Sequence, residues 1–179
     1  MPSVFTHAVA ALALGTALLP RGAGPRPWLL GVVCAVLPDI DVLAFALGVP
    51  YSAMLGHRGL SHSIFFALLL STVVATFAFR DGRWDGARRR IWLFLFAASA
   101  SHGILDAFTN GGLGIAFFAP FSAARYFFPV TPIEVSPIVP GFFAERGVRV
   151  LASEMMWVWT PALVLIAICV GLRRRRHTS

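Results

Sequence analysis

The chain has 179 residues, of which 58% are hydrophobic and 13% charged, and its net charge of +7 comes entirely from arginine. With a mean hydropathy of +0.77, this composition excludes an ordinary soluble domain and predicts a single integral membrane domain. A basic excess of this size would indicate a nucleic-acid partner in a soluble protein. Here the arginines cluster between apolar runs, so we expect no nucleic-acid partner and interpret them as determinants of membrane topology.

The pattern of apolar runs predicts an all-α, polytopic membrane helix bundle with about five transmembrane helices. The expected spans cover residues 3–19, 28–49, 62–79, 91–109 and 154–172. No basic segment precedes the first run and no clear cleavage site follows it, which favours a retained helix over a signal peptide. The segment 110–153 is rich in Pro, Gly and Phe and predicts a re-entrant or interfacial cover, with an aromatic belt as the alternative.

Arginines are distributed unevenly between the two sides of this predicted bundle. The loops after the first and third runs and the C-terminal tail carry eleven of the fifteen arginines. By the positive-inside rule these three segments are cytoplasmic, so the N-terminus is expected outside and the C-terminus inside.

Ionisable side chains gather at a similar depth on the other side. The set comprises four histidines and three aspartates: His7, Asp39, Asp41, His57, His62, His102 and Asp106. His102 and Asp106 are four residues apart and so share one helix face. Such a set matches the ligands of a zinc-like centre with one or two ions. The alternatives are a buried His–Asp hydrogen bond, an interfacial histidine at position 7 and an ordinary loop around His57.

Asp39 and Asp41 lie two residues apart beside Pro38. Residues with this spacing do not face the same way on a regular helix. Either the backbone departs from the α-helix there, or one aspartate is a ligand while the other orients a ligand. Capping of a helix broken near Pro38 is the structural alternative.

Four motifs resemble those of a known family. They are Thr6-His7, Leu37-Pro38-Asp39-Ile40-Asp41, His57-Arg58-Gly59-Leu60-Ser61-His62-Ser63 and His102-Gly103-Ile104-Leu105-Asp106-Ala107-Phe108-Thr109, with a weaker match at Pro120-Phe121-Ser122 and Arg125. The chain thereby resembles the bacterial YdjM-type membrane-bound metal-dependent hydrolases, a family linked by name to LexA. That family is distantly similar to zinc-dependent phospholipases C and P1-type nucleases. The resemblance implies hydrolysis of phosphoesters at a bacterial inner membrane. The predicted topology puts the site at the outer face, and a cover formed by 110–153 would favour a lipid-linked substrate.

On this resemblance we expect the His and Asp residues of the motifs, with Arg58 and Arg125, to form the functional site. The metal ligands are expected to be His7, Asp39, His62, His102 and Asp106, with zinc as the expected ion. The residues Asp41, His57, Arg58 and Arg125 are expected to serve catalysis, the two arginines by holding a phosphate. The alternative for both arginines is contact with lipid headgroups.

Two other classes of function stay open on the sequence alone. One is a metal-binding transporter or sensor, although the chain has no internal repeat that would support a transporter. The other is a non-catalytic structural or partner-binding membrane protein, with membrane lipid as the partner of the arginine-rich segments. The sequence leaves the oligomeric state open, because Gly31 and Ala35 could pack helices within one subunit or between two.

Overall fold

The computed structural model describes residues 1–136 and 145–178, and in these residues the secondary structure is helical, with two isolated β-bridges. The α-helices are α1 (Val4–Leu18), α2 (Pro25–Val36), α3 (Leu43–Ala46), α4 (Ile64–Ala78), α5 (Arg88–Ala107), α6 (Glu145–Glu154) and α7 (Thr160–Thr178). Short 3₁₀ segments are η1 (Leu37–Val42), η2 (Leu60–His62) and η3 (Gly82–Trp84), and a π-helical turn, η5 (Met155–Trp159), joins α6 to α7.

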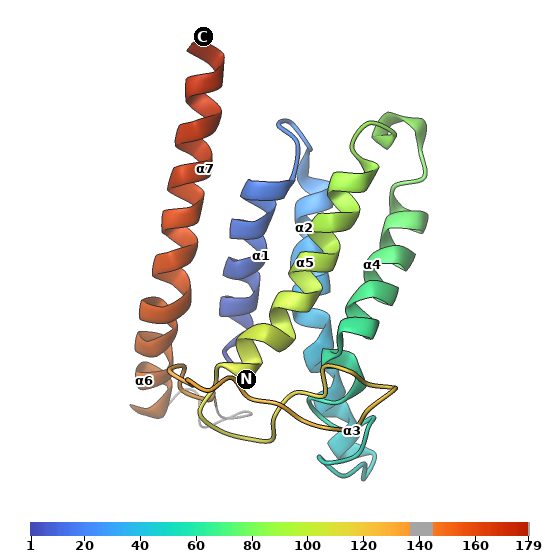
Figure 1. The fold of residues 1–179 in the computed structure, drawn as a ribbon, viewed down its shortest axis with the longest axis vertical. Coiled ribbons are helices and arrows are strands. Elements are labelled where there is room, and N and C mark those ends of the chain that lie inside the picture. Colours follow the sequence, from blue (N-terminus) through green and yellow to red (C-terminus); the bar gives the residue numbers. More distant parts are fainter. Residues whose placement is uncertain (137–144, 179) are drawn as a thin grey trace.

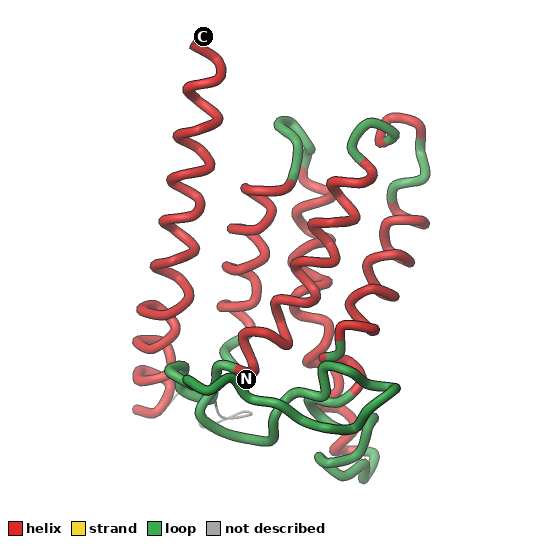
Figure 2. The backbone as a smooth tube through the Cα atoms, viewed as in Figure 1, coloured by secondary structure: helices red, strands yellow, loops and turns green. Residues whose placement is uncertain are grey.

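The long helices run alternately up and down, so the two ends of the bundle differ (Figure 1). The α1–α2 turn, the α4–α5 connection and the C-terminal end of α7 lie at one end. The N-terminus, η1, η2 and the loops lie at the other, where Figure 2 shows most of the irregular backbone. This arrangement agrees with the predicted separation of the arginine-bearing segments from the His/Asp motifs.

The core between α1, α2, α4 and α5 is built from small residues around aromatic rings. Phe94 of α5 is fully buried, and a Cβ placed on Gly31 of α2 would lie 2.1 Å from its ring. Gly31 and Ala35 are both buried inside this core. Gly31 and Ala35 therefore pack helices within the subunit.

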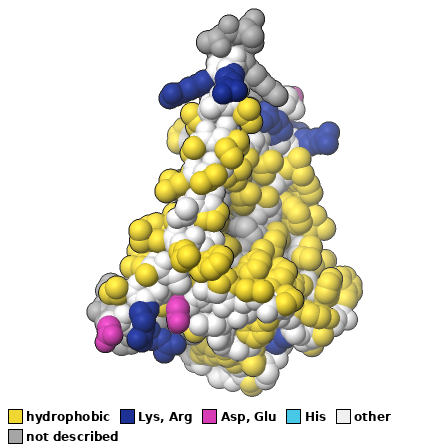
Figure 3. Space-filling view, turned by 60° about the vertical axis from the view of Figure 1, so that its left-hand side comes forward, with side chains coloured by type: hydrophobic (Ala, Val, Ile, Leu, Met, Phe, Trp, Pro, Cys, Tyr) yellow, Lys and Arg dark blue, Asp and Glu magenta, His cyan; other side chains and the backbone are white. Residues whose placement is uncertain are grey.

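Two stretches are long and apolar enough to cross a membrane, Pro25–Ala46 and Glu145–Arg175. In the most apolar part of each stretch, only 22% (Pro25–Ala46) and 11% (Glu145–Arg175) is buried inside the protein. The core helices of a soluble protein are mostly buried. In Figure 3 hydrophobic side chains cover the middle of the visible face, with charged side chains near both ends. These surfaces suit a lipid environment.

Length and composition support two of the five expected spans. The apolar helices α1 and α4 have 15 residues each, so each is about 22 Å long, short of a bilayer core of roughly 30 Å. Helix α5 has 20 residues and includes three arginines, His102 and Asp106. These polar residues lower its mean hydropathy, so α5 is not among the stretches that hydropathy supports as membrane spans.

The element boundaries differ from the predicted ones at most helix ends, and two of the differences are the start of the second helix and the segment 110–153. The second helix begins at Pro25 rather than residue 28, because proline is well suited to the first turn, where its missing N–H has no helical partner. The segment 110–153, predicted as irregular, ends in the helix α6, which continues through η5 into α7. Residues 110–136 form a loop across the site end of the bundle, and residues 137–144 of this predicted cover lie outside the described residues.

Candidate metal centre

Four side chains from three parts of the fold converge at the end of the bundle opposite the arginine-bearing turns. Asp39 comes from η1, His62 from η2, and His102 and Asp106 from α5. One ligand atom of each lies within 4.8 Å of the others. The Nε2 atom of His102 lies 3.1 Å from His62 Nε2 and 3.2 Å from Asp39 Oδ1.

The carboxylates in this cluster lie at ion-pair distance of Arg58 and His102 but accept no hydrogen bond among the described residues. Both oxygens of Asp39 and both of Asp106 are buried without a hydrogen bond among the described residues. Buried carboxylates are costly unless they are paired or coordinate a metal. Two such groups facing two imidazole Nε2 atoms form a donor set of nitrogen and oxygen that fits a divalent cation.

Each of the two histidines is oriented through its Nδ1 atom. His102 Nδ1 lies 2.7 Å from the carbonyl oxygen of Ala35, and His62 Nδ1 lies 3.1 Å from Asp41 Oδ2. When Nδ1–H donates to these oxygens, the Nε2 lone pair of each ring is directed into the cluster. A carbonyl or carboxylate in this supporting position is the usual companion of a metal-ligating histidine.

Asp41 holds the surrounding loop together. Its Oδ1 atom lies 2.6 Å from His57 Nδ1, and its Oδ2 atom accepts hydrogen bonds from Ser61 Oγ (2.5 Å) and the Arg58 backbone N–H (3.1 Å). Asp41 and His57 also form, with Asp39 and His62, a second group whose ligand atoms lie within 4.8 Å of one another. The pair could therefore orient His62 or supply part of a second ion site.

The backbone explains how two aspartates two residues apart serve one site. Residues Leu37–Val42 form a 3₁₀ helix rather than an α-helix. With three residues per turn, Asp39 and Asp41 point about 120° apart around the axis, against about 160° in an α-helix. The departure from the α-helix that the spacing suggested is present, and it lets Asp39 face the cluster while Asp41 reaches the loop.

His7 lies beside the four-residue group rather than in it. Its ring stacks on that of His102, with centroids 3.8 Å apart, and its Nε2 atom is 3.5 Å from Asp106 Oδ1. Both ring nitrogens are buried without a hydrogen bond among the described residues. The structure thus brings the fifth predicted ligand next to Asp106 and outside the tight ligand group.

Arg58 is a fully buried cation next to Asp106. Its Nε atom is 3.1 Å from Asp106 Oδ2, while its two Nη atoms donate to Thr109 Oγ1 and to the carbonyl oxygens of Gly111 and Leu113. Its φ of 62° lies in the left-handed region, which an arginine adopts only when surrounding contacts compensate. These contacts fix Asp106 and the following loop and leave little of the guanidinium for a substrate.

Arg125 is likewise engaged by the protein. Its Nη atoms donate to four backbone carbonyl oxygens, those of Tyr51, Ala53, His57 and Gly114. Burial lowers the pKa of its guanidinium. The side chain therefore fastens the loop that carries His57 to the loop that follows α5, and its Nη donors face backbone rather than the cluster.

An apolar cavity of about 200 Å³ opens beside His62. It is lined, besides His62, by Ile64, Phe96, Ala100, Ile104 and Phe117. Phe117 belongs to the loop 110–136, so this loop does contribute to the wall of a space that reaches the cluster.

Sequence reasoning missed one buried carboxylate at the start of α1, the helix that carries His7. Glu154 accepts hydrogen bonds from the Ser3 backbone N–H, Ser3 Oγ and Thr6 Oγ1 at the start of α1. It ties the helix that carries His7 to the base of α7. The signal available in the sequence was a lone acidic residue at the entrance to an apolar run.

A membrane protein with an all-helical fold and a buried His/Asp cluster at one end is the class that these observations define. A model of the YdjM inner membrane protein family matches residues 1–178, and the chain belongs to this family. It is similar to the inner membrane protein YbcI of Escherichia coli (strain K12), with 39% identity over 176 residues, or 97% of this chain and 100% of that protein. No solved structure matches the chain significantly.

Proposed function

We propose that this protein is a membrane-embedded metal-dependent hydrolase that acts on phosphoesters. The observation that carries the proposal is the set of carboxylate oxygens of Asp39 and Asp106, which are buried without a hydrogen bond among the described residues and face the Nε2 atoms of His62 and His102. A cation is the simplest group that satisfies all four side chains at once. Since Asp39 and His62 belong to both candidate ligand groups, the cluster has ligands for one ion or for two.

The identity of the ligands favours zinc. Imidazole nitrogens with carboxylate oxygens are common zinc donors, and Ca²⁺ and Mg²⁺ prefer all-oxygen sets. When bound, such an ion lowers the pKa of water toward about 7 and supplies a hydroxide nucleophile at neutral pH.

The chain's own residues then manage orientation and proton transfer. Asp41 holds His57 through Nδ1, which leaves His57 Nε2 as the proton acceptor. We assign His57 as the base that takes the proton of the attacking water and returns it to the leaving alkoxide. Arg58, through its contact with Asp106, acts as a positioning residue rather than as a phosphate ligand.

The apolar cavity beside His62 favours a substrate with an acyl chain. Its lining is almost entirely hydrocarbon, and it lies between α4, α5 and the loop 110–136. A lipid phosphoester could place its chain there and its headgroup at the cluster. A water-soluble ester would gain nothing from such a wall.

We further propose that all five long helical stretches cross the inner membrane, with the metal cluster toward the outer face. The family description and the relative's name support the inner membrane. The short helices α1 and α4 would be accommodated by local thinning of the bilayer around the bundle. The positive-inside rule places the arginine-bearing end in the cytoplasm.

The decisive experiment measures metal in the purified, detergent-solubilised protein by elemental mass spectrometry. We expect one or two zinc-like ions per chain in the natural protein and loss of metal in His102→Ala. His177→Ala, near the end of α7, is the matched control and should keep the full content. Equal metal in His102→Ala and the natural protein would refute the assigned centre.

Substrate class is tested separately on metal-loaded protein with phosphate mono- and diesters, with and without acyl chains. Ala100→Phe fills the cavity and should lower kcat/KM for acyl esters more than for soluble esters with the same headgroup. Ala167→Phe, on the exposed side of α7, is the control for an added ring. An equal loss on both ester types would remove the support for an acyl site.

A further inference from the structure

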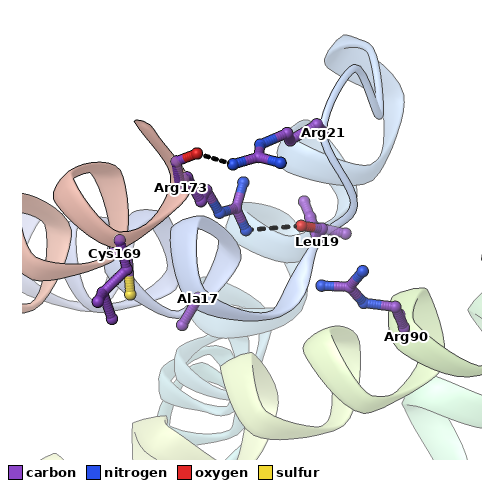
Figure 4. Close-up of a pocket in the computed structure, with 7 residues that line it drawn as sticks. Ala17, Leu19, Arg21, Arg90, Cys169 and Arg173 are labelled. Atoms are coloured by element: carbon purple, nitrogen blue, oxygen red, sulfur yellow. Dashed lines mark hydrogen bonds between the residues drawn. The ribbon is translucent and has the colours of Figure 1, made fainter. Parts of the chain in front are cut away.

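A second cavity, which is polar, lies at the arginine-bearing end of the bundle, far from the candidate metal cluster. It has a volume of about 270 Å³ and is formed by the end of α1, the turn after it, the start of α5 and the last turns of α7. Its lining comprises Ala17, Leu19, Arg21, Arg90, Cys169, Leu172 and Arg173. Figure 4 shows the three guanidinium groups gathered around Leu19.

Backbone carbonyl oxygens hold these three guanidinium groups in place. Arg90 Nε donates to Leu18 O (2.9 Å), Arg173 Nη2 donates to Leu19 O (2.8 Å), and Arg21 Nη2 donates to Arg173 O. Each bond uses one of the five N–H donors that an arginine carries. The side chains are thereby fixed at the cavity while most of their donors stay available.

The charge of this cavity is not balanced by a carboxylate in the described part of the chain. Among the described residues, no carboxylate lies within ion-pair distance of Arg21, Arg90 or Arg173. The aspartates at this end pair elsewhere, Asp81 with Arg83 and Asp85 with Arg88. Three positioned guanidinium groups without a counter-charge form a site for an anion, and their planar forks suit phosphate.

The rest of the lining indicates that the anion carries hydrocarbon. Ala17, Cys169 and Leu172 provide an apolar wall, and the outer side of α7 continues it with the exposed side chains of Leu165 and Ile168. A headgroup phosphate at the arginines would leave its acyl chains along this surface. A free phosphate ion would use only the polar part of the cavity.

We propose that this cavity binds the phosphate headgroup of an anionic phospholipid and so fastens α7 to the α1–α2 turn. Basic pockets between helices at a membrane surface are typical sites for such headgroups. The site is distinct from the metal cluster and does not depend on the hydrolase proposal, because its residues share no contact with that cluster.

Native mass spectrometry of the delipidated protein in neutral detergent tests this inference. Titration with phosphatidylglycerol should give a one-to-one adduct, and zwitterionic phosphatidylcholine should bind more weakly. The triple variant Arg21→Gln/Arg90→Gln/Arg173→Gln should lose phosphatidylglycerol affinity by at least about tenfold, since a hydrogen bond to a charged group contributes about 1.5–3 kcal/mol. Arg83→Gln removes one positive charge at an exposed position at the same end of the bundle. This control should bind phosphatidylglycerol as the natural protein does.

A single substitution tests the proposal even if the triple variant does not fold. Arg21 is exposed and holds one backbone carbonyl, so Arg21→Gln should keep its helical content by circular dichroism and still bind phosphatidylglycerol several-fold more weakly. Natural affinity in both arginine variants would overturn the proposal. Competition by soluble glycerol phosphate at the concentration of the lipid would also overturn it, by reassigning the cavity to a water-soluble anion.

Discussion

The buried carboxylates of Asp39 and Asp106 pose the main energetic problem of this fold at the scale of single residues. Arg58 lies next to one oxygen of Asp106, but no arginine among the described residues contacts Asp39. An ionised carboxylate in a medium of low dielectric constant costs several kcal/mol when it is unpaired. The protein nonetheless builds α5, η1 and η2 so that these oxygens face each other and two imidazoles. A cation bound in the centre would offset this cost.

The supporting role of Asp41 leads to the first prediction. Four donors surround its carboxylate, two from imidazole rings, one from Ser61 and one from the Arg58 backbone. In Asp41→Asn the amide NH₂ must face one of these donors, so His57 or His62 loses its orientation. We expect metal affinity to fall about 10–100-fold, the usual cost of losing such a support. Chelator competition measures it.

The control for this variant is Asp85→Asn, an exposed carboxylate at the opposite end that pairs with Arg88. It should leave metal affinity unchanged. If Asp41→Asn also retains the natural affinity, Asp41 does not orient the ligands and the loop must be held by its other contacts.

Motif spacing predicted the members of the cluster but not the task of each one. The seven His and Asp residues and both arginines do lie at one end of the bundle. Spacing could not show that the Arg125 Nη donors meet four backbone carbonyls, or that His102 Nδ1 meets Ala35, because these partners are main-chain atoms from distant segments. Any residue type could supply such a carbonyl, so the sequence contains no signal for it.

At the scale of elements, the approach of η2 to α5 depends on Gly103. A Cβ at this position would lie 2.6 Å from the carbonyl oxygen of His62, closer than any real contact. Gly103→Ala should therefore push His62 away from His102 and destabilise the protein by about 1–3 kcal/mol, the range for overpacked cores. Thermal unfolding with and without added zinc measures both effects, and we expect the zinc-induced increase in Tm to shrink.

Substitution of alanine for Gly171 of α7 is expected to change the stability of the protein in the opposite direction. A Cβ there meets nothing within 4 Å, and alanine is favoured over glycine in a helix by up to about 1 kcal/mol. Gly171→Ala should thus be neutral or slightly stabilising. Similar Tm values for the two variants would contradict the tight η2–α5 contact.

Docking of α7 onto α1 depends on Glu154, which is completely buried. In Glu154→Ala the donors of Ser3 and Thr6 lose their acceptor, which should cost about 2 kcal/mol of unfolding free energy. Glu145→Ala, at the exposed start of α6, should change it by less than about 0.5 kcal/mol. Urea unfolding of both variants in detergent micelles measures the difference, and equal midpoints would show that Glu154 does not anchor α7.

The existence of the long helices was predictable from hydropathy, whereas their ends and the geometry of the break near Pro38 were not. The 3₁₀ geometry of Leu37–Val42 and the helix Glu145–Glu154 escaped prediction for different reasons. In the first, Pro38 signals a break without specifying its geometry. The second is amphipathic and charged, so a search for apolar runs passes over it, and only its continuity with α7 makes it part of a long helix.

At the scale of the whole molecule, the two proposed sites are separated along the axis of the bundle. The metal cluster lies at the end that carries η1, η2 and the loop 110–136, and the arginine cavity lies at the other (Figure 1). Apolar side chains cover the surface between them. A bilayer around this surface would expose the cluster to one aqueous phase and the arginines to the other.

This polarity gives the last prediction, which concerns the orientation of the bundle. In a background with Cys34 and Cys169 replaced by alanine, Ser52→Cys introduces a thiol at the cluster end. Gly86→Cys introduces one at the arginine-bearing end, where a Cβ meets nothing within 4 Å. By the positive-inside rule the arginine-bearing end lies in the cytoplasm. A maleimide that enters the periplasm but cannot cross the inner membrane should therefore label Ser52→Cys in intact cells. It should label Gly86→Cys only after the inner membrane is permeabilised. The reversed pattern would put the metal cluster in the cytoplasm, and labelling of both would contradict a bundle that spans the membrane between these loops.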